Sequence, residues 1–291
     1  MKPIAASELI INSDGSVFHL HLRPEELAEN VILVGDPGRV DMVSSLFDGK
    51  EFTKSSREFN TVTGSYRGKR VTVLSTGIGT DNIDIVMNEL DALANINLET
   101  RTIKEEKKCL NILRIGTSGA IQPEIPLGSF VLSHISVGCD GLLNWYSGRD
   151  KVSDLEMERE FVSQTGWIKG LPAPYFVHAG NKIINAMKSD TIEGITISAS
   201  GFYGPQGRVL RIPLSMPDMV EQFENFRYNG KKITNFEMEG SAIAGLSAIL
   251  GHQAATVCCI IANRHRKESR TDYKQDIMRL VEFSLERITT L

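Results

Sequence analysis

The sequence lacks the excess of positive charge that non-specific contact with nucleic acid requires. Its 291 residues carry 32 Lys and Arg against 36 Asp and Glu, a formal net charge of -4 at pH 7. A long hydrophobic run is also missing. The longest weakly polar stretch, Ser241 to Ala262, is interrupted by His252 and Gln253, which is typical of a helix followed by a buried strand. We therefore expect no nucleic-acid partner and no membrane association.

Cysteine is scarce, and its four copies form no CxxC pair. Cys258 and Cys259 adjoin within an apolar run, which favours small core residues in a reducing compartment over zinc sites or disulfides. The first fifteen residues have one Lys, no sustained apolar run and an early Glu8, unlike a secretory signal. No metal-ligand spacing occurs at His21, His134, His178, His252 or His265. We expect a cytoplasmic protein without a metal ion.

No repeat or Pro/Ser-rich linker divides the chain, so we expect one domain over residues 1–291. With 41% hydrophobic and 23% charged residues, the chain can bury a large core. Short apolar runs, several followed by glycine turns and helical periodicity, predict an α/β sheet with helices on its faces. These runs are Val31 to Val34, Val71 to Leu74, Ile112 to Ile115, Phe130 to Val137, Ile195 to Ala199 and Ala255 to Ala262.

Three helices are marked by apolar spacing. One follows Thr80-Asp81, where Asp81 is expected to cap the free amides. A second is expected over Ser241 to Leu250, ended by Gly251 in a left-handed backbone conformation. A third is expected from about Tyr273 onward. The polar segment Asn97 to Lys108 predicts a solvated excursion between a helix and the strand at Ile112.

Two predicted strands run into glycine turns. The segment Val31 to Arg39 places Gly35 and Arg39 where backbone amides and a guanidinium can hold a phosphate, although an ordinary turn with a surface arginine fits as well. The segment Leu74 to Asn82 has Asn82 where a dinucleotide fingerprint needs its third glycine, which weakens an NAD hypothesis. The turn still suits a small ligand, because neighbouring strand ends open a crevice there.

Two further segments carry charge into apolar surroundings. Arg114 lies inside a predicted strand and needs an anionic partner, either a buried carboxylate or a bound anion. Glu237 and Glu239 share one face if their segment is extended, whereas in a helix only one can enter a pocket. A carboxylate can bind a sugar diol, but charge complementarity at a helix N-terminus explains either residue alone.

The two glycine turns, the segment around Arg114 and the segment with Glu237 and Glu239 follow one another in this order, with Ser55 to Phe59 between the first two. Together they resemble the uridine phosphorylase branch of the nucleoside phosphorylase family. The likeness extends from about Val17 to Asn263. It implies a three-layer α/β phosphorylase/hydrolase-like fold with a central mixed β-sheet flanked by helices. It also implies dimers that can combine into hexamers, inorganic phosphate as co-substrate and no cofactor.

The resemblance also implies which residues form the site. The phosphate ligands would be Gly35, Arg39, Arg114 and Thr117, joined by Arg57 from a neighbouring subunit. Thr117, Met238 and Glu239 would contact the ribose, with His19 contributed across the dimer interface. Phe18, Phe202, Gln206, Arg208 and Arg264 would form the base pocket.

Base identity depends on Gln206 and Arg208. The amide offers an acceptor and a donor and the guanidinium offers donors only, which suits the N3–H and carbonyl oxygens of uracil. The strand at Ala255 to Ala262 runs into Asn263-Arg264, where bacterial purine-cleaving relatives place a catalytic Asp. This difference argues against purines. The residues after Arg208 also differ from the bacterial pattern, so the choice among uridine, deoxyuridine and thymidine stays open.

The chain departs from the family pattern in two places. Gly79-Thr-Asp-Asn82 replaces the common Gly-Gly-Pro-Ser, and the segment Asn97 to Lys108 is longer than usual. The first change weakens the expectation of a potassium site formed by Glu58, Ile78 and Asn82, in a region that binds a monovalent cation in some relatives.

The predicted reaction is reversible phosphorolysis of uridine to uracil and ribose 1-phosphate. The alternatives are a nucleosidase that uses water, a purine nucleoside phosphorylase and an inactive ligand-binding homologue. An NAD oxidoreductase is a more distant alternative.

Overall fold

Each predicted apolar run forms a strand in the computed structural model, which describes residues 2–291. The strands are β1 (Asn30–Val34), β2 (Gly49–Ser56), β3 (Phe59–Tyr66), β4 (Lys69–Ser75), β5 (Ile96–Asn97), β6 (Thr102–Ile103), β7 (Asn111–Ala120), β8 (Phe130–Gly138), β9 (Tyr175–His178), β10 (Ile192–Ser198), β11 (Arg227–Tyr228), β12 (Lys231–Glu237), β13 (Gln253–Asn263) and β14 (Glu268–Ser269). The α-helices are α1 (Gly38–Ser44), α2 (Thr80–Asn95), α3 (Arg149–Val152), α4 (Leu155–Thr165), α5 (Asn181–Met187), α6 (Met219–Asn225), α7 (Gly240–Leu250) and α8 (Lys274–Ile288). Short 3-10 turns are η1 (Pro24–Glu26), η2 (Leu142–Trp145) and η3 (Gly204–Gln206).

The main sheet is mixed and has the order β11-β12-β10-β8-β13-β7-β1-β4-β3-β2. β1 lies parallel to β4 and β7, and β13 lies parallel to β7. The end of β12 also pairs antiparallel with β7, through Asn235 opposite Ala120 and Phe236 opposite Gly119. The strands β7, β13, β8, β10 and β12 therefore close into a ring, which brings the carboxyl ends of β7 and β12 together.

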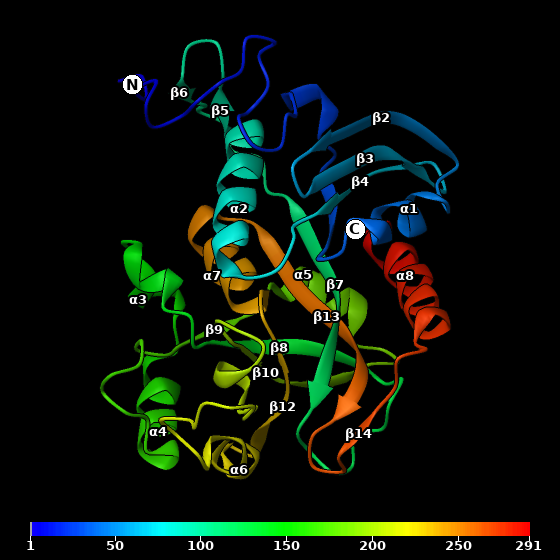
Figure 1. Cartoon of the computed structure of the whole chain (residues 1–291). Coiled ribbons are helices and arrows are strands. Elements are labelled where there is room, and N and C mark those ends of the chain that lie inside the picture. The colour runs from blue at the N-terminus through cyan, green and yellow to red at the C-terminus, as the bar shows by residue number, and fades with distance from the viewer. Residues whose placement is uncertain (1) are drawn as a thin grey trace.

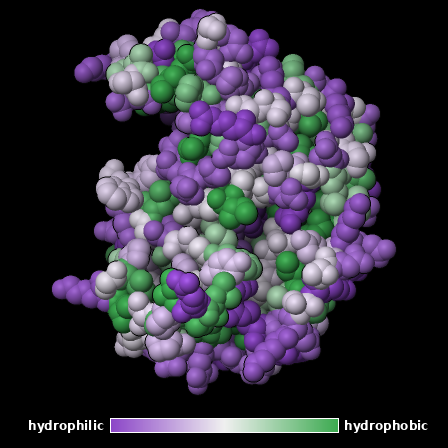
Figure 2. Space-filling model, viewed as in Figure 1, coloured by the Kyte–Doolittle hydropathy of each residue, from purple (hydrophilic) through white to green (hydrophobic). Residues whose placement is uncertain are grey.

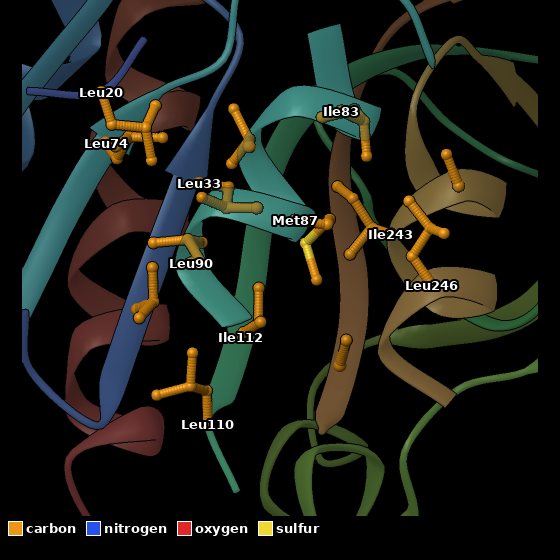
Figure 3. Close-up of a cluster of buried hydrophobic side chains, with 14 of the residues drawn as sticks. Leu20, Leu33, Leu74, Ile83, Met87, Leu90, Leu110, Ile112, Ile243 and Leu246 are labelled. Carbon is orange, nitrogen blue, oxygen red and sulfur yellow. The ribbon is translucent and has the colours of Figure 1, made fainter. Parts of the chain in front are cut away.

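Helices cover both faces of the sheet, as the alternation along β1 shows. Leu33 packs with Met87 of α2 and Ile243 of α7 in one buried cluster, while Ile32 and Val34 belong to a second cluster with residues of α1, α5 and α8. Figure 3 shows side chains of β1, β7, α2 and α7 meeting between the sheet and its helices. Figure 1 shows α2 and α7 on the opposite side of β7 and β13 from α8. The expected α/β fold, a mixed sheet flanked by helices, is confirmed.

One local prediction was wrong. Asp81 does not cap α2: Gly79 occupies the cap position with a φ of +98° and has no side chain to accept the amides of the first turn. The segment Asn97 to Lys108 lies between α2 and β7 and is mostly exposed, as predicted. It is also ordered locally, because the β5–β6 pairing closes it and Lys104 donates to the Ala94 carbonyl at 2.9 Å. The Ile4 amide also donates to the Arg101 carbonyl at 2.8 Å, which ties this segment to the N-terminal residues.

The surface seen in Figure 2 is mainly hydrophilic, with hydrophobic patches in its lower part. Within residues 2–291, no helix is both long and apolar enough to cross a membrane, and no three His, Cys, Asp or Glu side chains are grouped to hold a metal ion. All four cysteines are free thiols: Cys139, Cys258 and Cys259 are buried, but Cys109 is exposed and therefore does not fit the prediction of core residues.

Candidate active site

A cavity of about 920 Å³ opens where the carboxyl ends of β1, β4, β7 and β12 meet. The residues of four separate sequence motifs line it together. Those named above as site candidates are Gly35, Arg39, Ile78, Arg114, Thr117, Phe202, Gln206, Arg208, Met238 and Glu239. Parallel strands present their carboxyl ends at one edge, which is why motifs at strand ends converge.

Arg114 lies at the centre of this cavity wall and is buried. The alternation along β7 points it to the same side as Ile112, toward the N-terminal ends of α2 and α7. Its Nη1 lies 3.3 Å from Glu237 Oε2, and its Nη2 pairs with Glu239. Both carboxylates therefore reach the arginine. Gly116 makes room for it, because a Cβ at that position would collide with the guanidinium.

The two carboxylates differ in their other contacts. Glu237 ends β12 and caps α7, accepting the amide hydrogens of Glu239 at 2.9 Å and Gly240 at 2.8 Å. Glu239 instead accepts the Gly79 amide at 2.8 Å, so it links α7 to the glycine turn after β4. Both carboxylates line the cavity. Burial acts to lower the pKa of Arg114, but the charges of Glu239 and Glu237 outweigh it and the pKa lies above its usual value.

Arg39 is a cation of the cavity that has no carboxylate partner. It lies in the first turn of α1, half-buried, and none of the ion pairs among residues 2–291 involves it. Thr117, near the end of β7, and Gly35, directly after β1, line the same cavity. An unpaired guanidinium, a hydroxyl and a glycine backbone next to Arg114 form a site suited to a small oxyanion.

The other wall of the cavity comes from the loop around η3. Arg208 donates to Gln206 Oε1 and to the Phe202 carbonyl, both at 2.6 Å, and its guanidinium stacks 3.8 Å from the Phe202 ring centroid. Burial and the nearby charge of Arg264 lower the pKa of Arg208 to about 10, so it remains cationic at neutral pH. This wall offers amide and guanidinium groups beside an aromatic face.

Arg264 does not line the cavity, although it was predicted in the base pocket. Its guanidinium donates to the backbone carbonyl of Gln206 at 2.9 Å and to that of Gly207 at 3.3 Å. It therefore supports the loop from behind. Conversely, the cavity is also lined by Ser269, Arg270, Thr271 and Tyr273, which were not predicted from the sequence. Those residues return to the site only through the antiparallel β13–β14 pairing, which leaves no local sequence signal.

Three predicted site residues gather outside this cavity. The rings of Phe18 and His19 lie 4.8 Å apart, and the Arg57 guanidinium carbon lies 5.7 Å from the Phe18 ring centroid. Phe18 and His19 are half-buried and Arg57 is exposed at the turn between β2 and β3. The chain thus presents these side chains as a surface group, called here the Phe18–His19–Arg57 cluster.

Two side chains of the predicted cation site also lie close together. A Cβ placed on Gly77 would meet the Glu58 Cγ at 3.2 Å and would clash with the Asn82 amide. Ile78 is exposed and lines the main cavity. The potassium site therefore stays a prediction, with a carboxylate and an amide beside a glycine turn.

Comparisons with known proteins identify the family. The family model described as the phosphorylase superfamily matches residues 29–290. The chain belongs to this superfamily. Uridine phosphorylase from Thermococcus kodakarensis is 31% identical over 276 residues, which cover 92% of this chain and 85% of that protein. Within the superfamily, the guanosine phosphorylase of Halorubrum lacusprofundi is 25% identical, over 94% of this chain and 98% of its own length.

A crystal structure of a phosphorylase-superfamily relative matches the fold along the chain. Trypanosoma brucei nucleoside phosphorylase, described as showing uridine phosphorylase activity, has a TM-score of 0.89 and 31% identity, with 97% of this chain and 100% of that chain covered. The protein is an enzyme of the nucleoside phosphorylase family, in the pentosyltransferase class. Identity near 30% to relatives with different bases leaves its nucleoside to be argued from the site.

Proposed function

We propose that the enzyme catalyses the reversible phosphorolysis of uridine, giving uracil and ribose 1-phosphate. The observation that supports this most is one cavity with Arg39 and Arg114 on one wall and the Gln206–Arg208 pair on the other. The first pair suits a phosphate dianion and the second suits the edge of uracil, whose N3–H needs an acceptor and whose oxygens need donors.

In this proposal the residues between the two walls hold the sugar. Glu239 accepts hydrogen bonds from the ribose hydroxyls, and Met238 packs against the sugar. Turning Glu239 toward the ribose releases Arg114 Nη2 for the phosphate. Bond cleavage leaves positive character on the sugar and negative charge on the base, so phosphate stabilises the first and Arg208 the second. Holding both reactants in one cavity supplies further rate acceleration.

Phosphate dependence is the first test. Purified protein incubated with uridine, deoxyuridine, thymidine or inosine should release base only when phosphate is present, with uridine among the substrates cleaved. Base release measured by chromatography, with and without phosphate, gives the answer. Equal uracil release in phosphate-free buffer would instead show a nucleosidase, and cleavage of inosine alone would show a purine phosphorylase. No release from any nucleoside would leave a ligand-binding homologue.

We further propose that the Phe18–His19–Arg57 cluster completes the cavity of a second copy of the chain. The cluster is on the surface and includes an exposed cation, whereas the cavity of the same chain is lined by other residues. A two-fold dimer would place the cluster of each copy over the cavity of the other. In that dimer Arg57 would add the third guanidinium to the phosphate site.

Mixing two inactive variants tests the shared site. Arg39→Ala and Arg57→Ala should each be poorly active alone. In a dimer that carries one variant in each copy, one site loses both arginines and the other keeps both. Co-expression should therefore restore activity to about one quarter of all sites, the statistical limit for random pairing. In the matched control, a chain that carries both substitutions is co-expressed with the wild-type chain. No restoration on mixing would place Arg57 in its own copy's site.

A further inference from the structure

Glu89 lies in the middle of α2, is almost fully buried and points its carboxylate at the chain segment that carries His19. It accepts the His19 backbone amide at 3.0 Å through Oε1 and at 3.1 Å through Oε2, and the Leu20 amide at 2.8 Å. Its Oε1 also lies 2.6 Å from the His19 ring Nδ1. Within residues 2–291, no Lys or Arg pairs with this carboxylate.

This arrangement fixes the imidazole in one orientation. A carboxylate has no proton to donate when ionised, so Nδ1 must carry the hydrogen that it shares with Glu89. The other ring nitrogen, Nε2, then faces away from α2. The side chain of His19 is 28% exposed against 12% for Glu89, so the ring is reachable while its anchor is not. The T-shaped contact with the Phe18 ring also restrains the imidazole.

We propose that Glu89 is a positioning residue, which holds the His19 imidazole so that Nε2 meets the nucleoside bound in the neighbouring copy. The inference rests on the proposed function and on the shared site. Glu89 itself touches no substrate. Its backbone contacts fix where the segment lies and its contact with Nδ1 fixes how the ring is turned, so a single carboxylate sets both.

Glu89→Gln is the test, since glutamine keeps the shape but offers one acceptor oxygen in place of two. We expect the KM for the nucleoside to rise about tenfold, the size of one hydrogen bond. The KM for phosphate should stay within about twofold, since Arg39 and Arg114 are untouched. In a His19→Ala background the same substitution should change the nucleoside KM by less than about twofold. Equal effects with and without His19 would overturn the proposal.

A mixed-copy experiment separates positioning from a general loss of structure. When Glu89→Gln is co-expressed with an excess of Arg39→Ala, the active sites combine the intact cavity of the first variant with the intact His19 and Glu89 of the second. Their nucleoside KM should return to the wild-type value. A KM that stays raised would show that Glu89 acts within its own copy. If Glu89→Gln fails to fold, Glu89→Asp, which keeps the charge on a shorter side chain, takes its place.

The matched control is Glu193→Gln. Glu193 pairs with His134 Nδ1 at 2.7 Å, a second Glu–His contact that lines no part of the main cavity. This variant should keep both KM values. The proposed function and the positioning role are contradicted by different results. A wild-type protein that phosphorolyses no nucleoside contradicts the proposed function. An active wild type together with an unchanged nucleoside KM in Glu89→Gln contradicts the positioning role.

Discussion

Replacing Arg114 by alanine should lower the free energy of unfolding by about 3–5 kcal/mol and remove nearly all activity. The arginine is buried between Glu237 and Glu239, and without it two carboxylates stay close together in a place with little water. Losing a partner from a buried charge group costs more than the pair itself contributes, because the remaining charges are uncompensated. Denaturant unfolding and phosphate-dependent uracil release measure the two effects.

The same substitution in a Glu239→Gln background gives the sharper comparison. Removing one negative charge should restore part of the stability that Arg114→Ala loses, because less charge is then left unpaired. Activity should not return, since a cation for phosphate and a carboxylate for ribose are both missing. Arg39→Ala is the control: it removes a half-buried cation without an ion-pair partner, so activity should fall while stability stays near wild type. Wild-type stability in Arg114→Ala would contradict the electrostatic account.

The strands that position the site could be predicted because both of their faces are covered. Helices pack on both sides of β1, β7 and β13, so their sequences are nearly continuous apolar runs and stand out from the rest. The β2–β3 hairpin was not predicted, because β2 alternates exposed and half-buried residues and contains charged side chains. Local capping was also misjudged, since Gly79 takes the position before α2 that a capping side chain would need.

The residues of the candidate site likewise divide into those that stand out in the sequence and those whose place depends on the fold. Arg39, Arg114 and Glu239 were predictable because each breaks a pattern: a charge at a glycine turn, in a buried strand or beside the start of a helix. The place of Arg264 behind the loop around η3 depends on the course of the chain after β13, which spacing does not encode. Glu89 was not predicted, because in the sequence it is one polar residue on an amphipathic helix and only the packing of the N-terminal segment against α2 shows what it contacts.

Arg208→Met should reduce kcat/KM for uridine by about 10²–10³-fold, the usual loss when one donor to a developing anion is removed. In the proposed reaction uracil leaves with a negative charge, and Arg208 is the cation on that wall of the cavity, cationic at neutral pH. Steady-state kinetics with varied uridine and varied phosphate give the result. The KM for phosphate should remain near wild type, because Arg39 and Arg114 keep their places.

The size of that loss should depend on the base. A 5-fluoro substituent makes uracil more acidic, so its anion needs less help, and 5-fluorouridine should lose less than uridine in Arg208→Met. Arg211→Met is the matched control, because Arg211 is an exposed arginine three residues along the same loop that does not line the main cavity. An equal loss for both nucleosides would show that Arg208 only binds the base. No loss for either would place the base elsewhere, and the Gln206–Arg208 pair would then no longer support uridine as the substrate.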